Sequence, residues 1–282
     1  MKNIGININA NKDPNEKILK EILNCIDKDK YNTYIFRDSK KINNMASELD
    51  IVISIGGDGT ILRTARILAK YSVPIIGINF GNLGFLTTAE SNELKKALSE
   101  LFAGKYFIEE RMMIQCILRD NKADKEIISL NDIVISKGAL SRVINYNMNI
   151  DGHYYNNIIA DGIILSTPTG STAYSLSAGG PIIYPTLDLI SITPICPLSL
   201  NMRSMILDSN SQISIKFDEK NESVFLTVDG QEAFELNSES EIIIKKSKYK
   251  SKLIRLEGHN YFETLRKKIM LRINKYEEGE CK

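Results

Sequence analysis

Apolar residues follow two different periods in roughly the first hundred residues of the chain. Short runs rich in Ile and Val have the length and composition of strands, and they span residues 2–8, 34–36, 51–55 and 73–78. Between and after these runs, apolar residues recur at the spacing of one helical face, over residues 14–26, 61–71 and 94–102. Strands that alternate with helices are typical of a parallel sheet covered on both faces. The pattern therefore predicts an N-terminal α/β domain with an open, mostly parallel sheet.

After Gly104 the pattern changes to short β-branched runs separated by turn residues. These runs span residues 112–118, 126–136, 142–150, 158–166, 211–217, 223–228 and 241–244. Two Asp-Gly pairs, Asp151-Gly152 and Asp229-Gly230, lie between such runs and predict hairpin turns, because glycine adopts a positive φ without penalty. We therefore predict a β-rich, sandwich-like C-terminal domain.

The end of the chain combines both patterns. Residues 254–256 and the periodic stretch 261–273 predict a last strand and a helix, which we expect to return to the first domain. The predicted domains are thus a phosphate-binding domain of residues 1–104, with residues 257–282 packed on it, and a β-rich domain of residues 105–256.

A Lys-rich stretch at residues 245–252 lies between two apolar runs. We predict a solvated hairpin loop here, and a basic surface that binds anions is the alternative.

The overall charge of the chain indicates which kind of partner to expect. The 36 Lys and Arg residues balance 35 Asp and Glu residues, so no global field favours nucleic acid or anionic lipid, and a small-molecule partner is expected. The 4 cysteines are scattered without a zinc or disulfide pattern, which fits a reducing cytoplasm. We find no export signal and no apolar stretch long enough for a membrane span, so we expect a cytoplasmic protein.

The most informative local motif is Gly56-Gly57-Asp58-Gly59-Thr60, between the strand at 51–55 and a helix expected to begin near Thr60. In α/β sheets, ligands bind at such strand-to-helix turns. Glycines let backbone amides approach a phosphate closely, and a helix N-terminus favours an anion. No Lys follows as in a P-loop, and no G-x-G-x-x-G is present. The motif therefore predicts a phosphate-binding turn that is neither a P-loop nor the usual dinucleotide-binding fingerprint.

Asp58 needs a role of its own, because a carboxylate repels a bound phosphate. It could accept the proton of an attacking hydroxyl, hold a divalent metal or cap the following helix. We favour proton acceptance.

Two further segments carry candidate chemistry. Residues 166–180 are crowded with hydroxyls, small residues and one aromatic ring, which suits a loop and helix start that bind the edge of a base. A polar connector is the alternative. Asn131-Asp132 lies between apolar runs, where a simple turn is the alternative.

These segments, in this order and with Ile78-Asn79-Phe80-Gly81-Asn82-Leu83-Gly84-Phe85-Leu86 after the first, closely resemble the NAD kinase family over nearly the whole chain. The Gly-Gly-Asp-Gly-Thr motif is shared with diacylglycerol-type lipid kinases and phosphofructokinase relatives. The Asn-Asp pair and the Thr-Pro-Thr-Gly-Ser-Thr-Ala-Tyr-Ser segment are much more specific. The resemblance implies an α/β domain, a β-rich domain and NAD between them.

The implied activity is transfer of the terminal phosphoryl group of ATP, or of a similar donor such as polyphosphate, to the adenosine ribose 2′-hydroxyl of NAD. A divalent cation, Mg²⁺, is expected to enter with the donor, because no cluster of ligands forms a dedicated metal site in the sequence. The resemblance also implies a homodimer or homotetramer.

By position, the resemblance implies that Asp58 accepts the proton of the ribose 2′-hydroxyl and that Gly59 touches the dinucleotide. It implies that Asn131 and Asp132 bind NAD through base and ribose hydroxyls. Arg63 matches a position near phosphate, where an exposed helix cation is the alternative.

Other implied contacts lie around the adenine. Phe85 is expected to place its ring near the adenine, and a core Phe is the alternative. The further implied contacts are Arg142, Asp161, Thr172, Ala173, Tyr174, Ser175, Leu176, Ser177, Cys196 and, near the far end of the site, Gln231.

Two residues depart from the family pattern. Ile159 occupies a position that is basic in some relatives, so a charge is absent there. Cys196 stands where relatives often carry a small residue such as Ala.

Two competing functions share part of the pattern. A diacylglycerol-type lipid kinase would share the glycine-rich turn, but the segment at 166–180 and the lack of an amphipathic membrane-facing helix argue against it. A module that binds NAD or NADPH without turnover is the non-enzyme alternative.

Overall fold

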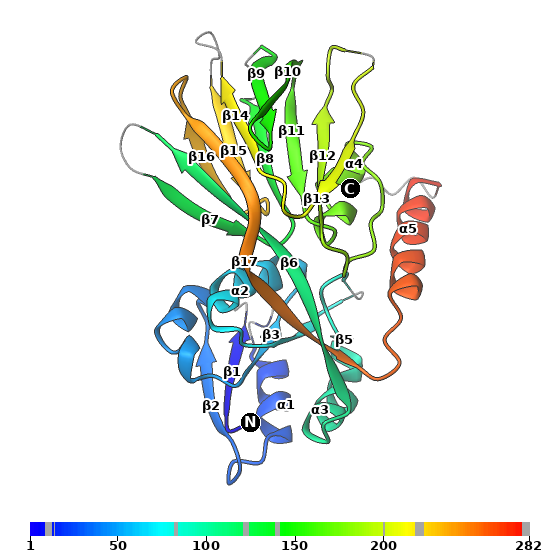
Figure 1. Ribbon diagram of the computed structural model, residues 1–282. Coiled ribbons are helices and arrows are strands. Elements are labelled where there is room, and N and C mark those ends of the chain that lie inside the picture. The colour runs from blue at the N-terminus through cyan, green and yellow to red at the C-terminus, as the bar shows by residue number, and fades with distance from the viewer. Residues whose placement is uncertain are drawn as a thin grey trace. The chain divides into compact units, whose positions relative to one another are not determined.

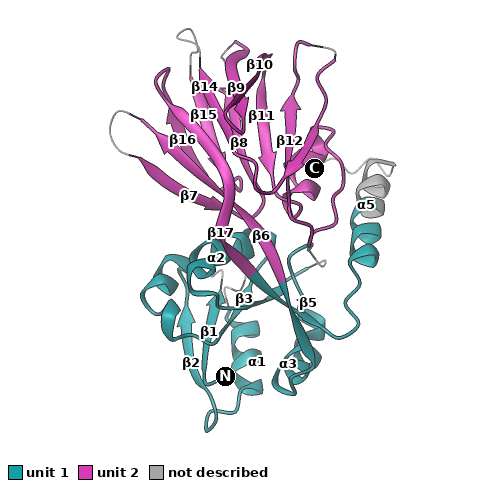
Figure 2. Cartoon of the chain, viewed as in Figure 1, with its two compact units in different colours: residues 1–109, 252–282 teal, residues 110–251 magenta. Residues whose placement is uncertain are grey.

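The computed structural model (Figure 1) describes residues 1–8, 13, 15–81, 84–120, 124–138, 142–199, 201–217 and 223–277, and of residues 270–277 the backbone alone. The chain divides into two compact units (Figure 2). Unit 1 comprises residues 1–109 and 252–282, and unit 2 comprises residues 110–251. The divisions fall inside the long strands β6 (Tyr106–Arg119) and β17 (Glu241–Leu256), whereas the sequence pattern placed them at residues 104 and 256. A continuous strand shows no break in composition where it passes from one unit to the next.

Unit 1 is built on a parallel sheet with the strand order β2-β1-β3-β4. These strands are β1 (Asn3–Ile8), β2 (Asn32–Phe36), β3 (Ile51–Ile55) and β4 (Ile75–Asn79). The short β5 (Ala89–Glu90) and the end of β17 also pair with β4 in parallel, with Leu253 opposite Ile75. The predicted parallel sheet and the return of the last strand to this unit are confirmed.

Helices cover both faces of this sheet (Figure 1). Alternate residues of β3, Ile51, Ile53 and Ile55, join a core with α1 (Lys17–Cys25) and α3 (Leu94–Phe102). On the opposite face lies α2 (Asp58–Leu68). Short 3₁₀ helices span Ser39–Asn44, Ala46–Glu48, Ala69–Tyr71 and Ser91–Glu93.

A buried polar network fixes α2 on the sheet. The Asn7 amide donates to Thr64 Oγ1 (2.7 Å), and the Ser54 hydroxyl lies 3.3 Å from the same oxygen. Thr64 in turn donates to the Thr60 carbonyl (2.8 Å). Buried polar groups are costly unless paired, so this network resists rotation of α2 about its axis. The first turn of α2, which carries Asp58, is thereby held at the carboxyl end of β3.

The first helix begins later than its apolar pattern predicts. The Asp13 carboxylate accepts hydrogen bonds from the backbone N–H groups of Lys17 (2.9 Å), Ile18 (3.1 Å) and Leu19 (3.1 Å). These bonds satisfy amides that have no partner inside the helix, so α1 begins at Lys17 rather than at residue 14, which lies outside the described residues.

Unit 2 is a sandwich of two antiparallel sheets, as predicted. One sheet has the order β13-β12-β11-β8-β15-β16, and in the other β10, β9, β14 and β17 are neighbours in that order while β6 pairs with β17 and β7. The strands are β7 (Lys125–Ser129), β8 (Asp132–Lys137), β9 (Ile144–Ile150), β10 (His153–Ala160), β11 (Gly162–Ser166), β12 (Leu189–Ile195), β13 (Met205–Asp208), β14 (Ile213–Phe217), β15 (Val224–Val228) and β16 (Glu232–Leu236). Inward-facing residues of both sheets form one core, which includes Ile133 of β8 and Met148 of β9.

Several strand predictions in this unit need correction. The run at 126–136 is divided into β7 and β8 by Leu130 and Asn131, and the run at 158–166 is divided into β10 and β11 by Asp161. The sequence pattern missed β12 and β13. Both Asp-Gly hairpin turns are confirmed, because Asp151-Gly152 and Asp229-Gly230 all have positive φ.

The predicted Lys-rich hairpin loop at 245–252 is wrong, since these residues lie inside β17. Ser247 and Ser251 are buried at 5% and 1% exposure, while Lys248 and Lys250 point outward. Lys250 pairs with Glu110 (2.9 Å) and Lys246 with Asp188 (2.5 Å). Small Ser side chains on the inner face let a very polar sequence continue as a strand.

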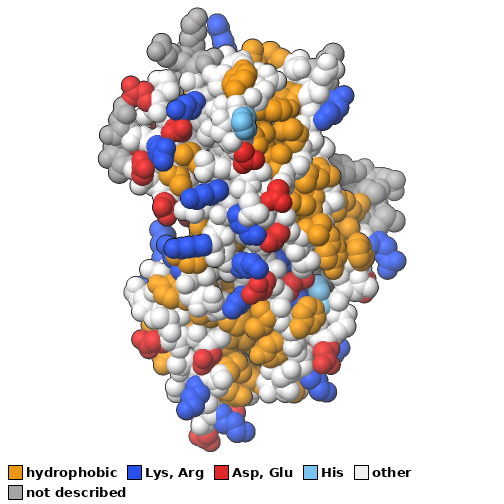
Figure 3. All heavy atoms as spheres, viewed as in Figure 1, with side chains coloured by type: hydrophobic (Ala, Val, Ile, Leu, Met, Phe, Trp, Pro, Cys, Tyr) orange, Lys and Arg blue, Asp and Glu red, His pale blue; other side chains and the backbone are white. Residues whose placement is uncertain are grey.

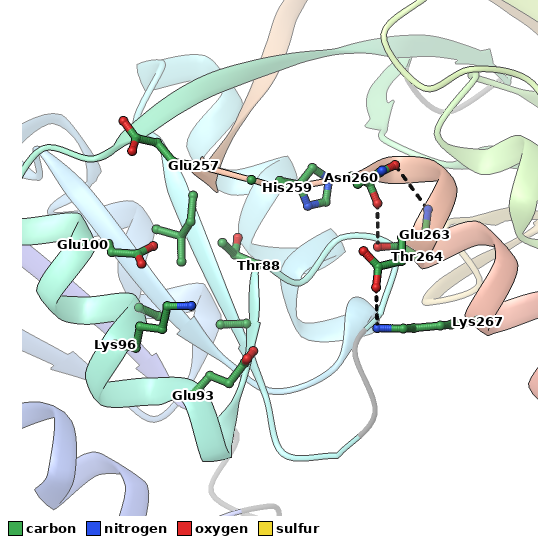
Figure 4. Close-up of a pocket in the computed structure, with 14 residues that line it drawn as sticks. Thr88, Glu93, Lys96, Glu100, Glu257, His259, Asn260, Glu263, Thr264 and Lys267 are labelled. Atoms are coloured by element: carbon green, nitrogen blue, oxygen red, sulfur yellow. Dashed lines mark hydrogen bonds and ion pairs between the residues drawn. The ribbon is translucent and has the colours of Figure 1, made fainter.

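The last helix, α5 (Tyr261–Glu277), begins at a side-chain cap (Figure 4). Asn260 Oδ1 accepts from the N–H groups of Phe262 (3.0 Å) and Glu263 (3.3 Å). The helix is assigned to unit 1, as predicted.

Candidate functional site

The glycine-rich motif forms the turn from β3 into α2 in unit 1. Gly56 has φ +154°, and a Cβ there would lie 2.3 Å from Thr60 Oγ1, so only glycine fits. The helix begins at Asp58, two residues earlier than the predicted start near Thr60. The residue that caps it is Gly57, without a side-chain hydrogen bond. The structure therefore contradicts the alternative in which Asp58 caps the helix.

The Asp58 carboxylate is instead held by a second loop. Its two oxygens accept hydrogen bonds from the backbone N–H groups of Phe85 (3.0 Å, to Oδ2) and Leu86 (3.1 Å, to Oδ1). A Cβ on Gly84 would lie 2.0 Å from Asp58 Oδ1, so the carboxylate fills the space that a side chain at residue 84 would need. Each oxygen keeps a further lone pair, and the group is half-buried, so it can accept a proton from a ligand.

Two of the neighbours of Asp58 on α2 face solvent. Gly59 and Arg63 are exposed on the first turns of α2, and Phe85 is half-buried. Phe85 contacts Asp58 through its backbone, and its expected ring contact with adenine stays a prediction.

In unit 2, the turn that carries Asn131 and Asp132 is organised by a buried carboxylate. Asp229 Oδ1 accepts from the N–H groups of Asn131 (2.8 Å) and Asp132 (3.3 Å), and Oδ2 accepts from Leu130 N–H (3.3 Å). The Ser129 hydroxyl adds a bond of 2.6 Å to Oδ1. Successive amides that point at one carboxylate form an anion nest, and here they make the turn rigid.

The hydroxyl-rich segment packs on the other side of this turn. Thr167 donates its hydroxyl to the Leu130 carbonyl (2.5 Å) and its N–H to the Asn131 carbonyl (2.9 Å). A Cβ on Gly170 would lie 2.1 Å from the Asn131 oxygen. The two segments that the sequence singled out are thus in direct contact.

This segment is not a solvated connector, because most of it is buried and hydrogen-bonded. Ser171 donates to the Pro168 carbonyl (2.7 Å), and Ser175 Oγ lies 3.0 Å from Thr193 Oγ1. The segment forms a 3₁₀ turn, Gly170–Thr172, and a short helix α4, Tyr174–Ser177. Tyr174, by contrast, is 47% exposed.

A pocket of about 370 Å³ opens beside these groups. It is lined by Asn131, Asp132, Val134, Ser136, Ala173, Tyr174, Thr227, Asp229 and Gly230. Strand alternation explains this lining, because Ile133 and Ile135 of β8 enter the core while Asp132, Val134 and Ser136 face the pocket. Four predicted residues, Asn131, Asp132, Ala173 and Tyr174, therefore meet at one cavity.

Asp132 titrates abnormally. Burial, and then the negative charge of Asp229, raise the pKa of the Asp132 carboxyl to about 7. Near neutral pH this group is present both as a hydrogen-bond donor and as an acceptor, which suits recognition of ribose hydroxyls or a base edge.

The remaining predicted residues do not line this pocket. Arg142 is exposed, and Asp161 forms an ion pair with Lys137 (2.8 Å), a residue that the sequence had not singled out. Cys196 is exposed with φ 44°, and Ile159 is 39% exposed. In the same unit, Gln231 follows the Asp229-Gly230 turn and donates its N–H to the Val228 carbonyl (2.9 Å).

A second pocket, of about 250 Å³, lies in unit 1 (Figure 4). Its lining mixes carboxylates of Glu93, Glu100 and Glu263 with the ammonium groups of Lys96 and Lys267, and it contains no predicted site residue. Among the described residues, no group of three or more His, Cys, Asp or Glu side chains is arranged to hold a metal ion. None of the helices in the described part of the chain combines the length and hydropathy of a membrane span.

Two protein-family models match this chain, one over its N-terminal part and one over its C-terminal part. Residues 5–106 match the family model of the ATP-NAD kinase N-terminal domain, and residues 130–256 match that of the ATP-NAD kinase C-terminal domain. The chain belongs to the ATP-NAD kinase family. The resemblance inferred from the motifs is thereby confirmed.

Relatives in this family match along the full chain. The NAD kinase of Clostridium botulinum (strain 657 / Type Ba4) is 49% identical over 284 aligned residues, covering 100% of this chain and 99% of the relative. The NAD kinase of Clostridium tetani is 48% identical over 277 residues, covering 96% of this chain and 100% of the relative.

Solved structures of NAD kinase relatives share the fold. The yeast NADH kinase complexed with NADH has a TM-score of 0.81 and 25% identity, covering 94% of this chain and 86% of that one. The NAD kinase from Archaeoglobus fulgidus in complex with ATP has a TM-score of 0.75 and 26% identity, covering 96% and 99%.

Sequence reasoning missed the groups that hold the predicted NAD kinase residues in place. Asp229 was identified only as a turn residue, although it organises Asn131 and Asp132. Thr167 and Gly84 were parts of quoted motifs without a role of their own. An Asp-Gly turn signals a hairpin, but nothing in the sequence shows which distant amides its carboxylate accepts.

We predict that Asp229→Asn weakens NAD binding about 10-fold or more, because an amide cannot accept all the bonds of the nest and presents N–H groups to other N–H groups. Isothermal titration with NAD measures this loss. Asp151→Asn is the matched control, since Asp151 occupies the other Asp-Gly turn and accepts bonds from Gln212 N–H (2.8 Å) and the Ser211 hydroxyl (3.1 Å). Equal NAD affinities of the two variants would contradict the role of Asp229.

We predict that Asp132→Asn changes how stability depends on pH. Because the folded protein binds the Asp132 proton more tightly than the unfolded chain does, the stabilisation from this group is complete below about pH 4 and is lost as the pH rises through about 7. The variant should therefore gain stability relative to the unsubstituted protein between pH 5 and pH 8, on the order of 2 kcal/mol. Urea unfolding at several pH values measures this difference, and parallel stability curves would refute it.

Proposed function

We propose that this chain transfers the terminal phosphoryl group of ATP to the 2′-hydroxyl of the adenosine ribose of NAD and so forms NADP and ADP. The observation that carries the proposal is the Asp58 carboxylate, held in a fixed direction at the N-terminus of α2 by two backbone N–H groups. Membership of the ATP-NAD kinase family supports the choice of substrates.

In the proposed reaction, the 2′-oxygen of NAD attacks the γ-phosphorus of ATP while the bond from that phosphorus to the β,γ-bridging oxygen breaks. The hydroxyl proton passes to the Asp58 carboxylate. An ordinary Asp has a pKa of about 3.9 and is too weak a base to ionise a ribose hydroxyl beforehand. The proton therefore moves late, and alignment of the hydroxyl supplies most of the rate enhancement.

The turn around Asp58 also suits the phosphates. Backbone N–H groups of the glycine-rich turn and the N-terminus of α2 favour an anion. We propose that Mg²⁺ arrives with ATP, where it neutralises phosphate charge. The residues fit this arrangement, since Mg²⁺ bound mainly through substrate phosphates and water needs at most one or two protein carboxylates.

Recognition of NAD is assigned to the pocket in unit 2. Asn131 offers an amide donor and acceptor, and Asp132 offers a carboxyl group with a pKa of about 7. Ala173 is small enough to admit a flat ring, and the exposed Tyr174 offers a surface on which a ring can stack. Other predicted contacts, Gly59, Arg63 and Gln231 among them, belong to the same proposal.

We also propose a cytoplasmic homodimer or homotetramer. The thiols of Cys25, Cys116 and Cys196 are all free, as in a reducing compartment. Exposed apolar side chains lie on β10 and beside it, including Tyr154, Ile159 and Leu198, whose N–H donates to the Ile159 carbonyl (3.0 Å). Figure 3 shows that hydrophobic side chains gather in patches on the face in view. Sedimentation of the purified chain measures its oligomeric state, and a monomer would refute this part.

We predict that Asp58→Asn lowers the turnover of NAD to NADP roughly 100-fold or more, because the amide cannot take up the proton, while NAD still binds. NADP formed from NAD, ATP and Mg²⁺ is measured by enzymatic cycling, and polyphosphate replaces ATP in a parallel reaction that identifies the donor.

Asp50→Asn is the matched control for Asp58→Asn. The Asp50 carboxylate also accepts two backbone N–H bonds, from Lys2 (2.6 Å) and Asn3 (2.9 Å), but it lies on the exposed surface. This variant should keep full turnover. Undiminished turnover in Asp58→Asn would refute the proton-acceptor role, and NAD binding without any NADP formation by the unsubstituted chain would favour a sensor.

A further inference from the structure

Arg255, near the end of β17, is completely buried in unit 1 and is among the largest side chains that reach no solvent. Its guanidinium donates to four acceptors. Nε pairs with Glu109 Oε1 (2.9 Å), Nη2 donates to the Phe85 carbonyl (3.1 Å), and Nη1 donates to the carbonyls of Leu86 (3.3 Å) and Thr87 (2.9 Å). A buried arginine is costly unless it is paired, and here one carboxylate and three consecutive carbonyls pair it.

These three carbonyls belong to the loop whose amides hold Asp58. The Phe85 carbonyl and the Leu86 N–H are the two ends of one peptide group. Arg255 Nη2 donates to its oxygen, and its N–H donates to Asp58 Oδ1, with 3.1 Å between the nitrogen and the oxygen. This peptide group is therefore fixed between a cation and an anion, and each hydrogen bond polarises the peptide in favour of the other.

Further hydrogen bonds restrict this loop, so it has little freedom to adjust if the bonds to Arg255 are lost. Gly84 donates its N–H to Thr87 Oγ1 (2.5 Å), and Thr88 donates its hydroxyl to the Ile254 carbonyl (2.6 Å), next to Arg255 in β17. The close approach of Gly84 to the Asp58 carboxylate leaves no space for the loop to move inward. Displacement of the carbonyls from Arg255 would therefore turn the two amides away from Asp58.

We infer that Arg255 is a positioning residue for the proton acceptor, acting through the Phe85–Leu86 peptide group. The inference rests on the proposed function, in which Asp58 receives the hydroxyl proton. Glu109 takes part by orienting the guanidinium, since its carboxylate accepts from Nε while Nη1 and Nη2 donate to the loop carbonyls.

The test follows from the shape of the guanidinium. Lys keeps the charge but lacks the planar fork that reaches three carbonyls and a carboxylate at once. Arg255→Lys should lower kcat roughly 10-fold to 100-fold, the loss expected when a reacting group is misplaced by about 1 Å. KM for NAD should change less than about 3-fold, because the pocket to which recognition of NAD is assigned lies in unit 2 and receives no contact from Arg255.

The decisive measurement repeats Arg255→Lys in the Asp58→Asn background. If Arg255 acts through Asp58, Arg255→Lys should change the kcat of the Asp58→Asn variant less than about 2-fold, because that variant has already lost the proton acceptor. A purely structural role would cost the same factor in both backgrounds, and that result would overturn the inference. A raised KM with unchanged kcat would also overturn it.

Two further variants control for stability. Ile254→Val, in the adjacent core position, should lower the unfolding temperature without lowering kcat. If Arg255→Lys does not yield folded protein, Glu109→Gln replaces it, and its smaller kcat loss should likewise vanish in the Asp58→Asn background. If the single variant Asp58→Asn keeps full turnover, both the proposed function and this inference are overturned. An impaired Asp58→Asn beside a fully active Arg255→Lys would overturn this inference only.

Discussion

The hydrogen bonds between backbone N–H groups and buried or half-buried carboxylates are the interaction on which both candidate sites depend. In unit 1 two loop amides fix the orientation of the Asp58 carboxylate beside the glycine-rich turn. In unit 2 the relation is reversed, because the Asp229 carboxylate directs the backbone that carries Asn131 and Asp132. A carboxylate accepts several strong bonds at once, so a single Asp can define the position of a whole loop.

The two carboxylates proposed to bind substrate have different surroundings, and the difference fits their proposed tasks. Asp58 is half-buried at a helix N-terminus, where a phosphate and a hydroxyl can reach it. Asp132 is 4% exposed, and burial together with Asp229 raises its pKa to about 7. A group that exchanges a proton near neutral pH can adapt its hydrogen bonding to a ligand, whereas a fixed carboxylate is suited to receive a proton from one direction.

The sequence predicted the elements that repeat and missed those defined by single distant contacts. Alternating Ile positions predicted β3, and Leu and Ala at helical spacing predicted α3, both with their observed bounds, while motif resemblance singled out Asp58, Asn131 and Asp132 as candidates. Strand β12 escaped prediction because Pro194 interrupts its pattern, and the Lys-rich part of β17 has the composition of a loop. The contact from Arg255 to Phe85 joins residues 170 positions apart, and local periodicity carries no information about such pairs.

The place of Arg255 in the chain has a consequence for how the protein is made. The glycine-rich turn and the loop at residues 84–88 are synthesised early, but the guanidinium that satisfies the loop carbonyls belongs to residue 255 of 282. The partner of Ile75 at the edge of β4, Leu253, is equally late. Residues 1–109 alone would therefore lack both a neighbouring strand and the anchor of the loop, and the region that contains the glycine-rich motif gains them only after residue 255 has been synthesised.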